Sequence, residues 1–119
     1  MVRFQPSDHL PLTPAMFQVL VALADGEKHG YAIIKEVARR TDGKVRLRAG
    51  TLYTVIKRFV ADGLIVESSE RPDPALDDER RRYYRLSERG RAVAVAEAER
   101  LAETLAQART KLALNWRRS

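Results

Sequence analysis

The stretch "RAGTLYTVIKRFVADGLI", residues 48–65, combines two different faces in one short predicted helix. Its large apolar side chains recur at the spacing of a single buried face, which consists of Leu52, Ile56, Phe59 and Val60. The opposite side carries small, hydroxyl and cationic residues, namely Gly50, Thr54, Lys57, Arg58 and Ala61. A surface that faces only water tolerates almost any polar mixture, whereas a surface that closely approaches a polyanion favours this composition.

The composition of the whole chain indicates the same class of partner. The chain has 119 residues, a net charge of +6 and no cysteine. This length suffices for one compact domain, and the basic balance favours nucleic acid first and an anionic membrane surface second. No apolar run approaches the ~20 residues of a membrane span, and no signal-peptide pattern is present, so we expect a soluble cytoplasmic protein. Residues 26–66 carry nine Lys or Arg against four Asp or Glu.

Three short amphipathic helices are predicted before residue 64, and each ends at an Asp-Gly pair. Thr13-Pro14 is a typical helix opening, because threonine caps the helix and proline suits its first turn. The second helix is predicted over residues 30–41 and the third over residues 49–62. The alternating residues 44–47 are compatible with a short strand, and residues 1–11 are expected to form an irregular N-terminal arm.

The periodicity of the sequence changes after the third helix. Residues 64–69 and 80–86 are typical of two strands joined by a loop with two prolines and three aspartates. Ser87 is the expected cap of a final helix that runs from about Glu88 to beyond Leu112.

Three helices followed by a hairpin predict a mainly α fold with a small β-hairpin, the winged helix-turn-helix, over residues 12–86. In this fold the third helix enters the major groove of DNA and the hairpin reaches an adjacent backbone or groove. Residues 87–119 are then a long C-terminal dimerisation helix with a basic tail.

Four blocks of the sequence resemble, in order and spacing, the signature of PadR-like transcriptional regulators. The blocks are His29-Gly30-Tyr31, Gly50-Thr51-Leu52-Tyr53, Asp62-Gly63-Leu64-Ile65 and Tyr83-Tyr84-Arg85-Leu86. The resemblance covers residues 12–102, and the single C-terminal helix is similar to the short branch of the family. It implies a homodimeric repressor that leaves its double-stranded operator when a small molecule binds.

Three features depart from the usual pattern of that family. Arg48 precedes the third helix, where the family often has a serine or asparagine cap. The loop of the hairpin is acidic and contains prolines, whereas many members have a short glycine-rich tip. Some short members stack an aromatic of the last helix on ligands, but here Leu101 occupies that neighbourhood and the only tryptophan is Trp116. The last departure concerns ligand binding at the dimer interface and not DNA binding.

The candidate DNA contacts lie on the third helix and the second strand of the hairpin. They are Gly50, Thr51, Tyr53, Thr54, Lys57, Arg58, Arg80 and Arg82. Lys and Arg neutralise phosphates, Thr can contact a phosphate or a thymine methyl, and a glycine lets a helix start lie against the backbone. The alternative is a solvated helix face without a partner. Tyr53 and Tyr31 are each compatible with a core ring whose hydroxyl contacts either a phosphate or a neighbouring backbone carbonyl. At least one arginine of the hairpin is expected to pair with the loop aspartates.

An enzyme is the second class of function, and the residue inventory argues against it. The chain has two histidines and no cysteine, and neither His9 nor His29 has neighbouring residues in the sequence that form a catalytic or metal-binding cluster. We therefore expect no metal and no cofactor. A protein-interaction adaptor is the third class, because winged helices also serve as assembly modules, but the basic third helix favours DNA.

The C-terminal helix carries an apolar stripe at a mean spacing near the ~3.5 residues of a helix–helix seam. Its members are Ala94, Ala98, Leu101, Leu105, Ala108 and Leu112. We expect this stripe to form a homodimer that binds an inverted-repeat operator, and its alanines leave space for an apolar or flat aromatic effector. The alternative is that its first turns pack on the first helix and the rest is solvated.

Overall fold

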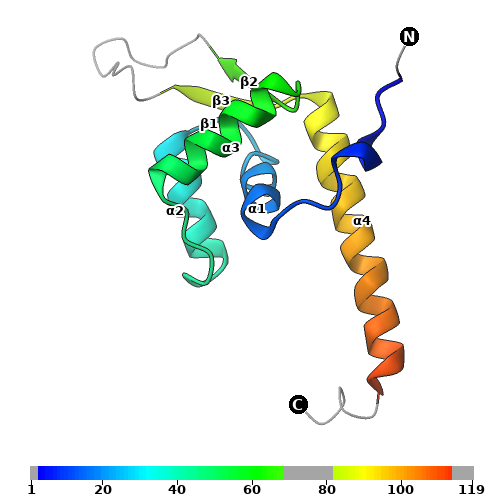
Figure 1. Cartoon of the computed structure of the whole chain (residues 1–119). Helices are drawn as coiled ribbons and strands as arrows, with labels where there is room; N and C mark the ends of the chain where they lie inside the picture. Colours follow the sequence, from blue (N-terminus) through cyan, green and yellow to red (C-terminus); the bar gives the residue numbers. More distant parts are fainter. Residues whose placement is uncertain (1–2, 69–81, 114–119) are drawn as a thin grey trace.

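The computed structural model describes residues 3–68 and 82–113 of the chain. Three helices form a compact unit against a small sheet, and a fourth helix extends away from it as a long rod (Figure 1). The elements in chain order are a 3₁₀ helix η1 (Pro6–His9), α1 (Pro14–Ala22), β1 (Lys28–His29), α2 (Gly30–Arg40), α3 (Ala49–Ala61), β2 (Ile65–Ser68), β3 (Tyr83–Leu86) and α4 (Glu88–Lys111). The predicted mainly α fold with a small antiparallel β element is confirmed.

Side chains cap the start of three of the four described α-helices. The Thr13 hydroxyl accepts a hydrogen bond from the Met16 N–H of α1 at 3.1 Å, as the sequence predicts. The Ser87 hydroxyl accepts the Gly90 N–H of α4 at 3.0 Å in the same way. His29 Nδ1 caps α2 by accepting a backbone N–H. Only α3 begins without a side-chain cap.

The sheet has three antiparallel strands in the order β1-β3-β2. The predicted strand at residues 44–47 is wrong, because these residues join no described ladder. The hydroxyl of Thr41 accepts the Val45 N–H at 3.0 Å, and Leu47 is buried, so the loop is held by its own contacts. The third strand is instead Lys28–His29, which the sequence analysis missed. Within the described residues, the returning strand β3 begins at Tyr83 and does not include Arg82; the predicted positions 80–81 lie outside the described part.

The core forms where α1, α2, α3 and the sheet meet. Its largest fully buried apolar side chains are Phe59, Leu20, Leu23, Ile33, Leu52, Leu64 and Ile65. The assignment of Val60 to the buried face is wrong, because this side chain is 40% exposed. A step of 100° per residue places Val60 at the edge of the stripe centred on Leu52, Ile56 and Phe59.

The N-terminal arm packs along the first half of α4. The view of residues 1–11 as irregular is incomplete, because Pro6–His9 form a 3₁₀ helix that contacts α4. The backbone N–H of Leu12 donates a 2.7 Å hydrogen bond to Glu97 of α4, whose side chain is 1% exposed. Arg100 also pairs with Glu97. α4 ends at Lys111, slightly earlier than predicted, and Leu112 is its C-cap.

Candidate nucleic-acid interface

The exposed side of α3 carries the predicted small, hydroxyl and cationic side chains together. Its buried residues are Leu52, Ile56 and Phe59, which fixes the orientation of the helix on the core. The exposed positions include Gly50, Thr51, Thr54, Lys57 and Arg58. The structure therefore brings these five candidates onto one accessible surface.

The start of α3 is open to an external partner. Arg48 occupies the N-cap position without a side-chain hydrogen bond to the helix. Helix geometry leaves the first backbone N–H groups without intrahelical acceptors, and these groups attract anions. A Cβ placed on Gly50 would meet no atom of the protein within 4 Å. The Thr54 hydroxyl donates a 2.9 Å hydrogen bond to the Gly50 carbonyl, so part of the hydrogen-bonding capacity of this hydroxyl is already used within α3.

Tyr53 lies between α3 and the start of α2. Its side chain is 39% exposed, and a Cβ on Gly30 would overlap its hydroxyl group. Glycine at position 30 therefore makes room for the Tyr53 ring across the helix–helix contact. Tyr31 is 62% exposed and stacks on His29 with ring centroids 6.4 Å apart. Both tyrosine side chains are exposed, so neither is a core side chain.

The two cations of α3 differ in their surroundings. Lys57 is exposed, and the Arg58 side chain is 72% exposed. Arg58 Nε lies 4.0 Å from Asp62 Oδ2, one helical turn later. This separation is longer than a hydrogen bond, and exposed pairs of this kind contribute little to stability, so Arg58 keeps its donors available.

The described part of the hairpin contains one of its two candidate arginines. Arg82 Nη1 lies 3.1 Å from Glu67 Oε1, so it pairs with the neighbouring strand β2. The expected pairing with loop aspartates falls on residues outside the described part, as does Arg80. The cation of Arg82 is thus partly neutralised within the sheet.

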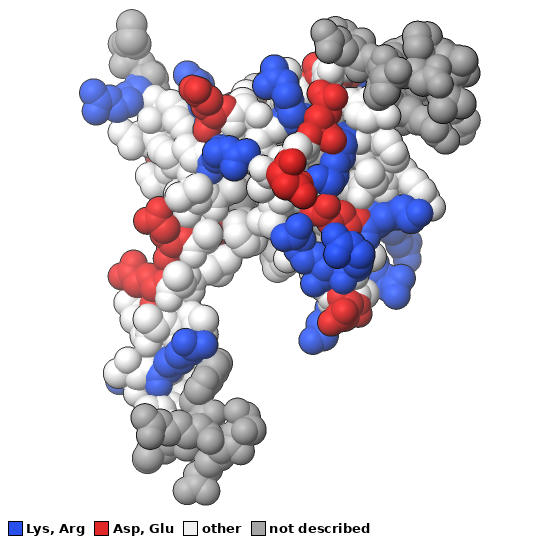
Figure 2. Space-filling model, turned by 180° about the vertical axis from the view of Figure 1, so that it is seen from behind, with Lys and Arg blue, Asp and Glu red and all other residues white. Residues whose placement is uncertain are grey.

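A group of cations that the sequence analysis did not select lies on α2 and on the loop that follows it. Lys35, Arg39, Lys44 and Arg46 are all exposed. Figure 2 shows a dense group of Lys and Arg side chains on the side of the molecule away from α4. In the sequence, the excess of nine cations over four acids in residues 26–66 indicated a basic region, but a charge count does not show which of these cations are exposed.

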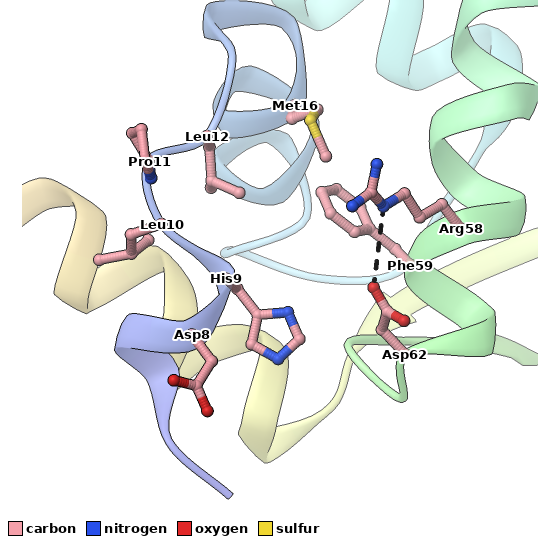
Figure 3. A pocket seen from close by; sticks show the side chains of 9 residues that line it. All are labelled: Asp8, His9, Leu10, Pro11, Leu12, Met16, Arg58, Phe59 and Asp62. Atoms are coloured by element: carbon pink, nitrogen blue, oxygen red, sulfur yellow. Dashed lines mark ion pairs between the residues drawn. The ribbon is translucent and has the colours of Figure 1, made fainter.

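A small hollow lies between the N-terminal arm and the last turn of α3 (Figure 3). Its volume is about 220 Å³, and it is lined by Asp8, His9, Leu10, Pro11, Leu12, Met16, Arg58, Phe59 and Asp62. Typical ligand pockets are larger, at roughly 300–1,000 Å³, and mostly apolar. His9 and Asp62 face this hollow from opposite walls (Figure 3).

The predicted dimer stripe is divided along α4. Ala94 packs against the core of its own chain, and Ala108 is half-buried. Ala98 is exposed, Leu101 and Leu105 are each 41% exposed, and Leu112 is 48% exposed. The buried residues of α4 are instead Gly90, Val93 and Glu97. The first turns of α4 therefore pack against the core of their own chain, whereas the three leucines of its later turns are exposed.

The described residues contain no group of three or more His, Cys, Asp or Glu side chains that could hold a metal ion. His29 has a structural explanation, because its Nδ1 accepts the Ala32 N–H at 3.1 Å. Within the same residues, no helix is long and apolar enough to span a bilayer.

Comparison with known proteins identifies relatives of the chain. The model of the transcriptional regulator PadR-like family matches residues 19–96. A transcriptional regulator of Mycobacterium tuberculosis is 39% identical over 89 residues, which are 75% of this chain and 76% of that protein. A PadR family regulator from Eggerthella lenta has a TM-score of 0.63 at 26% identity, over 82% of this chain and 80% of that one. Bacillus subtilis PadR in complex with operator DNA shares the fold, with a TM-score of 0.60 at 19% identity over 76% and 48% of the two chains.

Proposed function

Because this chain belongs to the PadR-like family of transcriptional regulators, we propose that it is a homodimeric repressor which a small molecule releases from an inverted-repeat operator. The family confirms the resemblance found in the sequence and the expectation of a DNA-binding regulator that is not an enzyme. Such a regulator acts where the operator is, which in a bacterium or archaeon is the cytoplasm.

The observation that carries the proposal is the exposed face of α3. Thr51 and Thr54 present short polar groups, Lys57 and Arg58 present cations, and Gly50 leaves the helix start uncovered. Phosphate contacts position a protein on DNA, whereas base contacts specify the sequence, and this face offers groups for both. Tyr53 belongs to the same helix, and Arg82 pairs with Glu67 of β2, a strand that contacts α3.

The dimer part of the proposal rests on α4. This helix has 24 residues and is therefore about 36 Å long. Only its first half has buried residues, and Leu101, Leu105 and Leu112 are exposed at helix–helix spacing. A second copy packed across a two-fold axis would cover these leucines. It would also hold two α3 helices about one duplex turn, ~34 Å, or a multiple of it apart, which matches an inverted repeat.

The effector part of the proposal uses the small residues of the same helix. Ala98 and Ala108 leave space beside the leucines, and an apolar or flat aromatic molecule would fit between two such helices. Ala94 is already packed against its own core, so the space lies toward the C-terminal half of α4.

A gel-shift titration with the DNA upstream of the protein's own gene tests the function. We expect preference for this DNA over random duplex and a dimer in sedimentation at micromolar concentration. The double variant Leu101→Glu/Leu105→Glu should be monomeric and should lose most operator affinity. Glu99→Gln/Glu103→Gln, on the same helix, is the matched control that should remain dimeric.

Each part of the proposal has its own contrary outcome. Equal affinity for operator and random duplex would favour the alternative of a winged-helix interaction adaptor. A wild-type monomer at micromolar concentration would remove the dimer and the inverted repeat with it.

A further inference from the structure

The hollow between the N-terminal arm and α3 has one wall from each of these segments (Figure 3). Arg58 and Asp62 of α3 line one side, and His9 of the arm lines the other. Its volume of about 220 Å³ exceeds that of a cavity of roughly 150 Å³ that holds benzene. The hollow is smaller than a pocket for a drug-sized ligand, but it has room for a small molecule of about six non-hydrogen atoms.

The accessible surface of the hollow is mostly polar. Its apolar members Phe59 and Leu12 are buried in the core, so little of their surface is available to a ligand. The side chains of Arg58 and Asp62 are exposed. A large apolar molecule would therefore cover little apolar surface here, in contrast to the exposed leucines of α4. The hollow fits a small polar ligand better.

The polar side chains of the hollow have unused hydrogen-bonding capacity. Arg58 Nε and Asp62 Oδ2 lie 4.0 Å apart, which is too far for a hydrogen bond. The His9 ring contacts the Phe4 ring, with centroids 5.6 Å apart. Within residues 3–68 and 82–113, the side chains of Arg58, Asp62 and His9 form no hydrogen bond to another residue. A ligand would therefore not have to displace an existing hydrogen bond.

The charges of the hollow disfavour a simple ion. Arg58 and Asp62 carry opposite charges on the same wall, one helical turn apart. The carboxylate of Asp8 points away from both (Figure 3). An anion attracted by Arg58 is repelled by Asp62, and the reverse holds for a cation. The acids and histidines of the described residues also form no group that could hold a metal ion. A ligand that carries a carboxylate and an ammonium group side by side satisfies both charges.

The wall from the N-terminal arm is already held in place by α4. The Leu12 N–H donates to Glu97 of α4 at 2.7 Å. The Phe4 ring contacts His9 and also the Arg89 guanidinium, whose carbon lies 4.9 Å from the ring centre. A ligand would therefore bind without first ordering the arm, which limits the conformational entropy lost on binding.

We propose that this hollow binds a small α-amino acid, with its carboxylate on the Arg58 guanidinium and its ammonium on the Asp62 carboxylate. The His9 imidazole closes the opposite side and offers a further hydrogen bond. Because the bound carboxylate occupies the donors of Arg58, this side chain is no longer available to a DNA phosphate. The amino acid therefore lowers operator affinity, and by linkage the operator lowers amino-acid affinity by the same factor. This last step rests on the proposed function, whereas the binding of the amino acid does not.

Three compounds of similar size test the charge requirement. L-Alanine carries both charged groups, propionate lacks the ammonium, and ethylamine lacks the carboxylate. NMR titration of the isotope-labelled protein at constant ionic strength gives each dissociation constant and the residues affected. For L-alanine we expect a constant on the order of 1 mM, because exposed ionic contacts are weak, with shifts centred on His9, Arg58 and Asp62. Propionate and ethylamine should bind at least about tenfold more weakly, because each leaves one of the two charges unpaired.

A single substitution tests the pairing of the ammonium. Asp62→Asn removes its partner and should abolish the preference for L-alanine over propionate. Asp42→Asn is the matched control, because Asp42 is also an exposed aspartate that precedes a glycine after a helix, and it does not line the hollow. This control should keep the wild-type preference. Thermal unfolding verifies that both variants fold. If Asp62→Asn unfolds, Arg58→Gln provides the reciprocal test and should abolish the preference for L-alanine over ethylamine.

Operator binding tests the regulatory step. L-Alanine has no net charge and leaves the ionic strength unchanged. At a saturating concentration it should lower the slope of log K against log salt by about 0.9, the contribution of one phosphate contact. If the lines meet at about 1 M salt, operator affinity at about 0.1 M falls roughly eightfold. Asp42→Asn should show the same loss on addition of L-alanine, and Asp62→Asn should show none.

Each step has a result that would overturn it. Equal affinities for L-alanine and propionate in wild type would refute a site for a zwitterion, and shifts confined to other residues would place the binding elsewhere. An equal loss of preference in both asparagine variants would reduce the effect to net charge. Saturable binding in the hollow with unchanged operator affinity would refute the regulatory step alone. A wild-type protein without preference for upstream DNA over random duplex would instead refute the proposed function, and the NMR titration would still decide whether the hollow binds the amino acid.

Discussion

Replacing Glu97 should separate the N-terminal arm from α4. The carboxylate of Glu97 is almost fully buried, and its Oε2 accepts the backbone N–H of Leu12 at 2.7 Å. The Arg100 guanidinium donates to the same carboxylate and holds its pKa below the ordinary value of a glutamate, although burial raises it. Glu97→Ala removes the acceptor and leaves the N–H of Leu12, which is 8% exposed, without this partner.

The magnitude follows from the geometry of this one hydrogen bond. A hydrogen bond to a charged acceptor contributes about 1.5–3 kcal/mol, and an unsatisfied buried donor costs about 1–3 kcal/mol. These two descriptions overlap, so we expect Glu97→Ala to lower the free energy of unfolding by about 2–3 kcal/mol. Glu97→Gln keeps an acceptor oxygen but loses the charge, and should lower it by about 1 kcal/mol.

Urea unfolding at neutral pH and one fixed protein concentration measures both variants, because any dimer makes stability depend on concentration. In thermal unfolding, the alanine variant should lose about 8–12 °C, at about 4 °C per kcal/mol for a domain of this size. Glu99→Ala, at an exposed position on the same helix, is the control and should stay within about 0.5 kcal/mol of wild type. Equal effects of Glu97→Ala and Glu99→Ala would refute the role of the buried carboxylate in holding the arm.

Three further predictions concern acid stability and the α3 face. The pKa of Glu97 is lowered in the folded state, so its stabilising contribution is present above the ordinary carboxyl pKa of about 4.3 and is lost as the pH falls through the folded value. Urea unfolding at pH 7 and at acidic pH should therefore show that the free energy of unfolding falls less on acidification for Glu97→Gln than for wild type. Lys57→Ala should weaken binding to all duplexes and lower the salt slope by about one, whereas Thr54→Ala should change the preference among operators if it reads a base; wild-type affinity in both gel-shift titrations at physiological salt would contradict the groove assignment. Gly50→Ala should preserve or raise the melting temperature yet weaken operator binding, whereas Gly30→Ala should lower the melting temperature; an unchanged operator affinity for Gly50→Ala would show that DNA does not approach this position closely.

The helices were predictable because their signals are local. Thr13 and Ser87 indicate where helices begin, and the N–H groups that they cap lie only three residues later in the sequence. The third strand was not predictable in this way. Lys28–His29 is only two residues long, and it exists because it pairs with Tyr83–Tyr84, which are more than fifty positions later. Residues 44–47 alternate as a strand does, but no described strand offers them a partner.

Prediction of the candidate site was limited in the same way, because local patterns do not show contacts between residues far apart in the sequence. Periodicity placed Thr54, Lys57 and Arg58 on the exposed side of α3, because a helix wheel depends only on neighbours. It could not find Glu97 as a buried anchor, since the Leu12 N–H that it binds is 85 positions away. The exposed cations of α2 and the following loop, Lys35, Arg39, Lys44 and Arg46, were also missed, because the sequence does not show which cations of this basic region are exposed once it folds.

Three glycines near helix starts occur for different reasons, which the structure distinguishes and the sequence alone does not. Gly30 makes room for the Tyr53 hydroxyl, and at Gly90 a Cβ would overlap the Leu64 carbonyl, so both are required by packing inside the protein. Gly50 also lies in the first turn of a helix, but a Cβ there would meet nothing within 4 Å. Alanine is the better helix former, so neither packing nor propensity accounts for glycine at this position. The same turn lacks a side-chain cap, because Arg48 makes none. A close anion would account for both features, since the absent Cβ would allow the approach and the uncapped N–H groups would receive the charge.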